Sequence, residues 1–271
     1  MNRSVVVTGA SRGIGAAIAR ELASRGWSVI AAARTEPDTR ALVRELENSF
    51  GQRACAVRMD VADPESVSTG IQRAEEFAAN AGPIEALVNN AGIAISAPLL
   101  GRSSTGIDLY EQHMRVNFHG ARLVAEGLLP GMIERGSGGI VNVASSAGLH
   151  GYSYVSAYCA SKHALIGWTR SAAMELESKQ VRVQAVCPHY VDSPMLAESV
   201  QRLVEKTGKS QAEAREFFAQ QNPGGRLVTP EEVARAVAYL LGRKITGTIL
   251  ELDGSRIEQT ASERENWPLS P

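Results

Sequence analysis

The chain has 271 residues, a formal net charge of −1 and 44% hydrophobic residues, few of which are aromatic. A near-neutral chain gives no electrostatic reason to expect nucleic acid, and an aromatic content of 5% argues against base-stacking surfaces. No apolar run approaches the ~20 residues that a membrane helix needs. We therefore expect neither a nucleic acid nor a membrane partner, and enough apolar material for one large domain.

The cysteines and the start of the chain predict the cellular compartment. Cys55, Cys159 and Cys187 are odd in number and scattered, so they form no disulfide framework and suit a reducing environment. The first residues run directly into the β-rich segment 5–7, without a cationic segment followed by a long apolar stretch. We expect a cytoplasmic protein.

Short apolar, β-branched runs alternate with stretches of helical periodicity along the chain. Strands separated by long helices imply right-handed crossovers and a parallel sheet covered on both faces. The sequence predicts an α/β fold with a doubly wound, Rossmann-type parallel sheet, a single domain over residues 1–271 and a polar surface tail from about 256 to 271. Strands are expected at 5–7, 28–32, 54–58, 86–88, 140–144, 181–187 and 248–252, and the clearest helices at 14–25, 64–79, 113–133 and 156–176.

Residues 195–221 form an amphipathic stretch between the sixth and seventh strands. It contains the capping-box pair Ser210 and Glu213, and a second such pair, Thr229 and Glu232, begins a further helix. Two added helices at the C-terminal edge of the sheet would form a small helical lid over the ligand crevice. A plain covering pair of helices is the alternative interpretation.

The segment T-G-A-S-R-G-I-G at residues 8–15 follows the first strand and opens the first helix. Its glycines allow a tight turn and a close approach of the backbone to a pyrophosphate, and the helix N-terminus faces the phosphate charge. A simple β–α turn that needs positive φ is the weaker interpretation, because three glycines stand at this spacing. The residues expected to hold a dinucleotide here are Gly9, Ser11, Arg12, Gly13, Ile14 and Gly15.

Further motifs follow in order: N-N-A-G at 89–92 after the fourth strand, and Y-x-x-x-K at Tyr158 and Lys162. Together with the glycine turn, they resemble the motifs of the short-chain dehydrogenase/reductase family, from residue 5 to about 255. The resemblance implies hydride transfer between a nicotinamide cofactor and a ketone or secondary alcohol, in one domain that both binds the cofactor and performs catalysis. It also implies the catalytic residues Asn117, Ser145, Tyr158 and Lys162, and the cofactor contacts Asn90, Ala91, Gly92, Tyr158 and Lys162.

The charge at the end of the second strand predicts the cofactor. An NAD enzyme usually has an acidic residue there, whereas this chain has Ala33 followed by Arg34. Arg34 and Arg12 would converge on a 2′-phosphate, which predicts NADP(H). Asp60, beside Val61, resembles the family aspartate that hydrogen-bonds the adenine amino group, and a turn-capping role is the comparable alternative.

Tyr158 and Lys162 stand four residues apart and share a helical face. An adjacent ammonium favours the phenolate, so we expect Lys162 to lower the pKa of Tyr158, which donates a proton in reduction and accepts one in oxidation. Ser145, thirteen residues before the tyrosine, is expected to hydrogen-bond the substrate oxygen, with Ser146 as its rival. By resemblance, Lys162 also holds the nicotinamide ribose, and Asn117 would bind a water that links Lys162 to solvent.

One departure from the family motif P-G-x-[VI]-x-T follows the sixth strand, where the chain has P-H-Y-V-D-S at 188–193. Pro188, Val191 and Ser193 match the motif or keep its hydroxyl and are expected to contact the cofactor. His189 replaces glycine and either packs or reaches the substrate. No metal is expected, because the histidines show no metal-ligand spacing and the tyrosine and serine supply the acid and the electrostatic help.

The candidate substrate wall is partly aromatic and mostly uncharged. A free carboxylate or phosphate is therefore not favoured, whereas a 3-oxoacyl thioester, a cyclic ketone or a polyketide intermediate would fit. The alternative is a catalytically weak NADP(H)-binding sensor or scaffold, which would be expected to lose Tyr158, Lys162 or Ser145. The wall residues are Ala94, Ile95, His150, Tyr152, Tyr154, Met195, Leu196 and Phe217.

Two predicted helices, 113–133 and 156–176, carry apolar residues on more than one face, which covering a single sheet does not require. The family resemblance implies that these two helices pair across a two-fold axis. We therefore expect a homotetramer or a homodimer, with a small-molecule carbonyl compound or alcohol as substrate.

Overall fold

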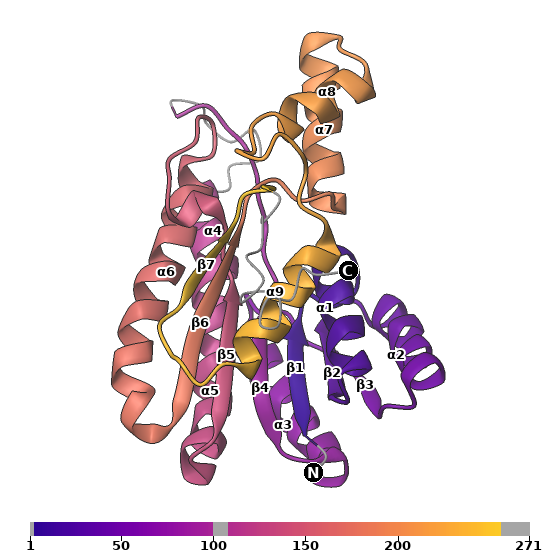
Figure 1. Cartoon of the computed structure of the whole chain (residues 1–271), viewed down its shortest axis with the longest axis vertical. Helices are drawn as coiled ribbons and strands as arrows, with labels where there is room; N and C mark the ends of the chain where they lie inside the picture. Colours follow the sequence, from indigo (N-terminus) through magenta and orange to yellow (C-terminus); the bar gives the residue numbers. More distant parts are fainter. Residues whose placement is uncertain (1–2, 100–107, 256–271) are drawn as a thin grey trace, which may run out of the picture.

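The computed structural model describes residues 3–99 and 108–255, built around one seven-stranded sheet (Figure 1). The strand order is β3-β2-β1-β4-β5-β6-β7, and every neighbouring pair is parallel. The predicted doubly wound, single-domain α/β fold is confirmed, while the expected tail from 256 to 271 lies outside the described residues. The strands are β1 (Ser4–Thr8), β2 (Ser28–Ala33), β3 (Ala54–Arg58), β4 (Ile84–Asn89), β5 (Gly138–Val143), β6 (Val181–Pro188) and β7 (Ile249–Leu252).

The central strand β1 is buried on both faces because its alternate side chains enter two different cores. Val5 and Val7 are buried among residues of α1, α2 and α9, whereas Val6 is buried among residues of α3, α5 and α6. Helices therefore cover both faces of the sheet, as its consecutive valines predict. One layer contains α1 (Gly13–Ser24), α2 (Glu36–Phe50) and α9 (Pro230–Gly242), and the other contains α3 (Pro64–Ala81), α5 (Ala121–Arg135) and α6 (Ser156–Leu176).

The connections of the sheet reverse between β1 and β4. From β1 the chain moves outward to β2 and β3, and then returns to place β4 on the other side of β1. In an open parallel sheet, such a reversal leaves a crevice at the carboxyl ends of the strands. The glycine turn at 8–15 and the N-N-A-G segment at 89–92 both follow these two strands, so the fold brings them to the same edge.

The predicted helix 113–133 is not one regular helix. It begins as α4 (Leu109–His113), widens into the π-helical turn η1 (Met114–Gly120) and continues as α5. Single π-turns within helices frequently occur at functional sites, where they redirect a side chain. The other long helix, α6, has the bounds that the sequence predicts.

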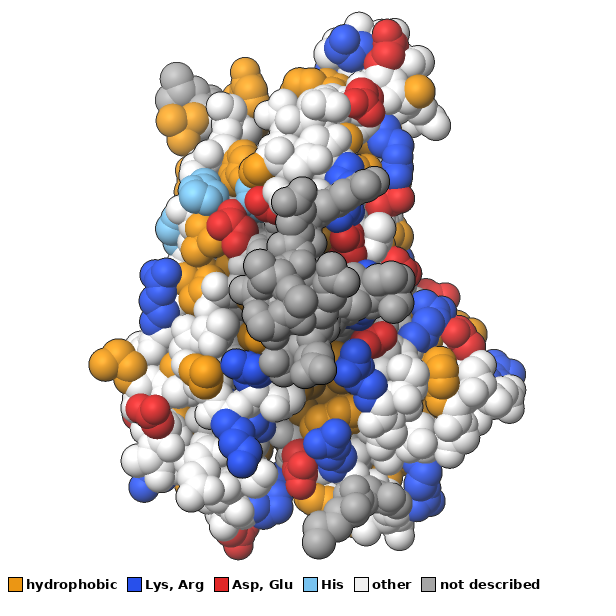
Figure 2. All heavy atoms as spheres, viewed as in Figure 1, with side chains coloured by type: hydrophobic (Ala, Val, Ile, Leu, Met, Phe, Trp, Pro, Cys, Tyr) orange, Lys and Arg blue, Asp and Glu red, His pale blue; other side chains and the backbone are white. Residues whose placement is uncertain are grey.

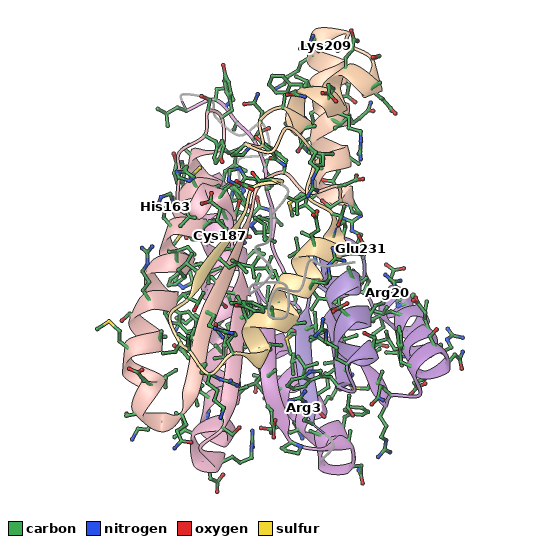
Figure 3. All side chains as sticks on the ribbon, in the orientation of Figure 1. Arg3, Arg20, His163, Cys187, Lys209 and Glu231 are labelled. Carbon is green, nitrogen blue, oxygen red and sulfur yellow. The ribbon has the colours of Figure 1, made fainter. Side chains whose placement is uncertain are left out.

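The lid stretch 195–221 contains two helices, α7 (Pro194–Thr207) and α8 (Gln211–Ala219). They extend beyond the carboxyl edge of the sheet, with Lys209 at the tip between them (Figures 1 and 3). The capping box of Ser210 and Glu213 begins α8 as predicted. Leu196, Val200 and Ala214 form a small apolar core inside this helix pair, which we call the lid below.

The helix that begins after Thr229 does not cover the crevice, and that part of the sequence interpretation is wrong. Its capping box is present, but Val233, Val237 and Leu240 of α9 are fully buried in the core that α9 shares with α1. Their spacing of three and four residues makes one apolar stripe, which requires the sheet as its partner. Of the added helices, only α7 and α8 are candidates for the lid, and a covering role over the crevice stays a prediction.

The shorter elements are two 3-10 turns, η2 (Ser146–Gly148) and η3 (Glu177–Lys179), on either side of α6. On the face that Figure 2 shows, basic and acidic side chains are interspersed, in keeping with the net charge of −1. Within the described residues, none of the helices is long and apolar enough to cross a membrane.

Candidate active site

The glycine turn after β1 presents backbone atoms with no side chain at its glycine positions. Gly9 has a φ of 65°, which favours glycine, and a Cβ there would lie 2.9 Å from the Cα of Ala91. A Cβ on Gly15 would collide with the carbonyl oxygen of Gly9. The turn therefore needs glycine at both positions, and it leaves backbone at the N-terminus of α1 open to a phosphate.

Asn90 and Thr8 join the N-N-A-G segment to the glycine turn. The hydroxyl of Thr8 accepts hydrogen bonds from the backbone N–H groups of Asn90 (3.0 Å) and Ala91 (3.1 Å). The Asn90 amide donates in return to the carbonyl oxygens of Thr8 (3.0 Å) and Gly9 (3.2 Å). Asn90 therefore holds the N-N-A-G segment against the glycine turn, and the backbone of Ala91 packs against Gly9.

The π-turn η1 directs Asn117 into the site, where its side chain is buried. Its Oδ1 accepts from the backbone N–H of Ile93 at 2.8 Å, and its Nδ2 donates to the Ile93 carbonyl and to Ser161 Oγ, both at 3.0 Å. Gly92 lies close by, since a Cβ there would be 3.2 Å from Asn117 Oδ1 and 3.7 Å from Lys162 Nζ. The side chain of Asn117 thus ties the segment after β4 to α6. The predicted water beside it stays a prediction.

Lys162 is buried on α6, with its ammonium inside the site. Nζ donates to the carbonyl oxygen of Val143 at 2.9 Å and lies 5.7 Å from the centre of the Tyr158 ring. Burial lowers the pKa of Lys162 to about 8, because the charged form loses its hydration. The ammonium is therefore still the main form at pH 7, and the free amine becomes the main form above pH 8.

The pKa of Tyr158 does not follow the sequence-based expectation. Burial raises the pKa of the phenol to about 12. The hydrogen-bonding contact with Ser145 lowers the pKa, by a smaller amount than burial raises it. The Lys162 ammonium donates to the Val143 carbonyl and lies 5.7 Å from the centre of the Tyr158 ring, and desolvation of the phenol is the largest cause of its shift in pKa. In this structure Tyr158 is a protonated phenol at neutral pH, which is the form that donates a proton.

Of the two rival serines, Ser145 is the one within hydrogen-bonding reach of Tyr158. Ser145 caps η2 by accepting from the backbone N–H of Ala147 at 3.1 Å, and its hydroxyl lies 3.4 Å from the Pro188 carbonyl oxygen. Ser146 is buried and instead accepts a hydrogen bond from the phenol of Tyr152 at 2.9 Å. The structure therefore brings Ser145, Tyr158 and Lys162 together at the carboxyl edge of β5.

A buried ammonium destabilises the fold, so we expect Lys162→Met to raise the melting temperature at pH 7. The pKa of Lys162 is about 8 in the folded protein against an ordinary 10.5, so the folded state binds fewer protons between these values. The penalty is complete below pH 8 and disappears as the pH rises toward 10.5. At about 1.4 kcal/mol per pKa unit it is roughly 3 kcal/mol, less the lost hydrogen bond to Val143.

Calorimetry of wild type and Lys162→Met at pH 7 and at pH 10.5 tests this assignment. The variant should gain stability at pH 7, and its advantage should shrink at pH 10.5. An advantage of equal size at both pH values would contradict it, because the gain would then come from packing rather than from the removed charge.

The two arginines expected to bind a 2′-phosphate lie at the outer rim of the crevice. Arg34 is exposed directly after the buried Ala33, and no ion pair holds it within the described part of the chain. The guanidinium of Arg12 stands 3.6 Å from the carboxylate of Glu198 on α7. Both partners of this pair are largely exposed, so the pair is weak and Arg12 can turn toward a phosphate.

Asp60 has the turn-capping role that the sequence left open. Its carboxylate accepts a hydrogen bond from the backbone N–H of Ala62 at 3.0 Å, while the N-cap of α3 itself is Asp63. Val61 is buried beside it and packs closely against Gly120 of the π-turn. The adenine contact implied for Asp60 stays a prediction.

The P-H-Y-V-D-S segment closes the site from the side of β6 and β7. Its histidine, His189, packs: the side chain is 6% exposed, and Nε2 lies 2.7 Å from a carboxylate oxygen of Glu251. Val191 is buried, and Ser193 caps α7 by accepting from a backbone N–H at 3.4 Å. Among the described residues, no group of three or more His, Cys, Asp or Glu side chains could hold a metal ion.

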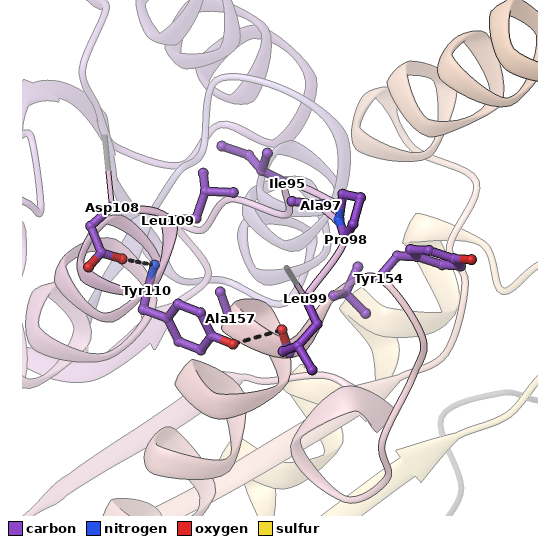
Figure 4. A pocket seen from close by; sticks show the side chains of 11 residues that line it. Ile95, Ala97, Pro98, Leu99, Asp108, Leu109, Tyr110, Tyr154 and Ala157 are labelled. Atoms are coloured by element: carbon purple, nitrogen blue, oxygen red, sulfur yellow. Dashed lines mark hydrogen bonds between the residues drawn. The ribbon is translucent and has the colours of Figure 1, made fainter. Parts of the chain in front are cut away.

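A cavity of about 140 Å³ opens between the segment after β4 and the starts of α4 and α6 (Figure 4). Ile95 and Tyr154 of the expected substrate wall line it. Tyr154 adopts a left-handed φ of 68°, a strained conformation for tyrosine, and its carbonyl accepts from Ala97 at 2.8 Å. Leu196 is buried inside the lid and Phe217 is exposed on α8, and their contact with a substrate stays a prediction.

Sequence reasoning missed two buried polar residues near the site. Asn222, after α8, pairs with the backbone of Tyr190 through two hydrogen bonds of 2.9 Å and so fixes the base of the lid. His113 ends α4 and contacts the ring of Tyr158. Its spacing of four residues from Asn117 could have placed it on the same helical face, whereas no local signal points to Asn222.

The family model described as short chain dehydrogenase matches residues 3–203. This chain belongs to that family. It is therefore an oxidoreductase by descent, and the ordered site at the carboxyl edge of the sheet is the part of the molecule where that chemistry is expected.

Several characterised proteins are similar over nearly the whole chain. Cis-4-hydroxycyclohexanecarboxylate dehydrogenase of Sinomonas cyclohexanicum is 38% identical over 93% of this chain and 95% of its own length. A 3-oxoacyl-[acyl-carrier-protein] reductase of Aquifex aeolicus is 34% identical over 92% of this chain and 95% of its own. A variant of actinorhodin polyketide ketoreductase with NADPH has a TM-score of 0.85 at 33% identity, covering 93% of this chain and 96% of that one. L-sorbose reductase of Gluconobacter frateurii with NADPH and L-sorbose also has a TM-score of 0.85, at 27% identity over 96% of this chain and 98% of that one.

Proposed function

We propose that this protein is an NADP(H)-dependent oxidoreductase that transfers a hydride between the nicotinamide and the carbon of a ketone or secondary alcohol. The observation that carries the proposal is the convergence of Ser145, Tyr158 and Lys162 beside the crevice that the glycine turn opens. The side chain of Asn117 donates a hydrogen bond to Ser161, next to Lys162 on α6, and Asn117 is the fourth proposed catalytic residue. The similarity to proteins whose names describe ketone reduction or alcohol oxidation supports the same reaction class.

A dinucleotide fits the crevice because the glycine turn leaves bare backbone where side chains would obstruct a pyrophosphate. The similar structures solved with NADPH support the choice of cofactor, and Arg12 and Arg34 on the rim support NADP(H) over NAD(H). When bound, the cofactor would supply or accept the hydride. The residues proposed to hold it are Gly9, Ser11, Arg12, Gly13, Ile14, Gly15, Arg34, Asp60, Val61, Asn90, Ala91, Gly92, Tyr158, Lys162, Pro188, Val191 and Ser193.

The side chains of the site suit proton transfer to a carbonyl oxygen. In reduction the phenol of Tyr158, protonated at neutral pH, donates its proton to the substrate oxygen. The hydroxyl of Ser145 donates a hydrogen bond to the same oxygen as negative charge develops there. Lys162 places a positive charge next to the phenol and so stabilises the phenolate that the transfer leaves. In oxidation the same groups act in reverse.

The proposed substrates are uncharged ketones and their alcohols, such as a 3-oxoacyl thioester, a cyclic ketone or a polyketide intermediate. Apart from Asp108, the residues that line the cavity beside α6 are uncharged, and the Asp108 carboxylate caps α4. A panel of such ketones, assayed with NADPH and with NADH by the loss of absorbance of the reduced nicotinamide, tests the proposal directly. Reduction of at least one ketone, faster with NADPH, is the expected result.

A sensor or scaffold that binds NADP(H) without turnover is the second candidate function. The retained Tyr158, Lys162 and Ser145 weigh against it, because a protein without chemistry has no need for a buried ammonium. Tight binding of NADPH together with no turnover of any ketone in the panel would favour the sensor.

The three cysteines are free thiols, which suits the cytoplasmic location that we also propose, and cell fractionation tests it.

We also propose a homotetramer, or failing that a homodimer, with α5 and α6 at the interface. Met174 on α6 is 80% exposed and Ile133 on α5 is 39% exposed, so both present apolar surface to solvent in the single chain. Light scattering at micromolar concentration should give a mass near four times 28.9 kDa. Met174→Glu should shift that mass downward by burying a charge at the contact, and a monomeric wild type would refute the assembly.

A further inference from the structure

His113, the last residue of α4, is fully buried and has a partner for each ring nitrogen. Nδ1 lies 2.7 Å from the carbonyl oxygen of Leu109, and Nε2 lies 3.0 Å from the backbone nitrogen of Ile95. A carbonyl only accepts and an N–H only donates, so Nδ1 carries the proton and Nε2 supplies a lone pair. The partners thus fix one neutral tautomer. Burial, together with the charge of Lys162, lowers the pKa of His113 and agrees with that form.

This imidazole joins three parts of the site. Ile95 belongs to the segment after β4, and Leu109 begins α4; both line the cavity (Figure 4). The imidazole ring also meets the Tyr158 ring edge-on, with 6.1 Å between centroids and 70° between planes. Such an edge contact stabilises one orientation of the phenol ring. A shift of Ile95 would therefore be transmitted to the Tyr158 ring through one side chain, that of His113.

His163 on α6 shows what a histidine does without this arrangement. Its Nδ1 makes the same local bond to the carbonyl four residues earlier, that of Cys159, at 2.9 Å. The side chain is exposed on the outer side of α6 (Figure 3). The bond to Ile95 and the contact with Tyr158 are thus what distinguish His113, and His163 provides a matched control.

We propose that His113 is a positioning residue, whose neutral imidazole locks the Ile95 segment of the cavity wall against the ring of Tyr158. The inference rests on the proposed function, because it concerns where the proton-donating phenol stands relative to a bound ketone. A donor displaced by about 1 Å can lose on the order of a hundredfold in rate, so a small loosening here is measurable.

Two variants that differ by one methylene group separate the two hydrogen bonds. His113→Gln places its terminal amide near the position of Nε2 and can still accept from Ile95. His113→Asn places its amide near Nδ1, keeps the bond to Leu109 and cannot reach Ile95. For ketone reduction with NADPH, we expect His113→Asn to lower kcat by about ten- to a hundredfold with little change in KM, and His113→Gln to stay close to wild type.

Two further measurements separate positioning from a general structural role. Amide hydrogen exchange of residues 93–98 should accelerate in His113→Asn and stay slow in His113→Gln, while NADPH binding stays the same in both. His163→Asn should match wild type throughout. Unchanged kcat or exchange in His113→Asn, or equal losses in the two variants, would overturn the inference. If wild type reduces no ketone, the proposed function fails, whereas the exchange experiment still decides whether His113 holds the Ile95 segment.

Discussion

Replacing Tyr158 with phenylalanine should lower ketone turnover by about 10²–10⁴-fold and leave NADPH binding unchanged. The variant keeps the aromatic ring, so the edge contact with His113 and the packing of α6 remain. It removes only the phenol oxygen, which is the group within reach of Ser145. Since burial holds the pKa of Tyr158 at about 12, this phenol is protonated and ready to donate at neutral pH.

Tyr152→Phe is the matched control for this variant. Its phenol donates to Ser146 at 2.9 Å, so the control removes a hydrogen-bonded hydroxyl from the same neighbourhood without touching Tyr158. Steady-state rates and fluorescence titration with NADPH compare the two. Near-normal turnover in Tyr158→Phe would end the proposed mechanism. In wild type, alcohol oxidation should also accelerate as the pH rises, because it requires the ionised phenol.

The strands and the long helix α6 could be predicted because their signals are local. Consecutive β-branched residues such as Val5, Val6 and Val7 indicate a strand buried on both faces, and the two neighbouring cores confirm it. The position of α9 could not be predicted. Its cap and apolar stripe show that one face is buried, but they do not say whether the partner is the sheet or the lid.

The residues of the site could be predicted better than its electrostatics. Motif spacing predicted the grouping of Ser145, Tyr158 and Lys162, which the fold places together. The pKa of Tyr158 was predicted with the wrong direction, because the sequence shows a neighbouring ammonium but not the depth of burial or the Val143 carbonyl that occupies it. His113 was missed for a similar reason, since its partner Ile95 is distant in sequence and contacts it through a backbone N–H.

Arg34→Ala should weaken NADPH binding by roughly ten- to a hundredfold and leave NADH binding nearly unchanged. A charge-assisted hydrogen bond contributes about 1.5–3 kcal/mol, and every 1.4 kcal/mol is tenfold in affinity. Arg34 is exposed and has no ion pair within the described chain, so its removal should disturb nothing else. Arg44→Ala is the control, because it removes the same charge from an exposed position further along α2. Titrations must share one ionic strength, since salt screens exposed charges.

Ala33→Asp should go further and reverse the cofactor preference. Ala33 ends β2 and is buried beside the rim, so a carboxylate there would repel a 2′-phosphate and offer the NADH ribose a hydrogen-bond acceptor. The ratio of kcat/KM for NADPH to that for NADH, measured with one ketone, should move from above one to below one. Two outcomes would show that the NADP(H) assignment is wrong: a wild type that already prefers NADH, or an Arg34→Ala variant that loses both cofactors equally. Either outcome would make Arg34 a solvated surface arginine rather than a phosphate ligand.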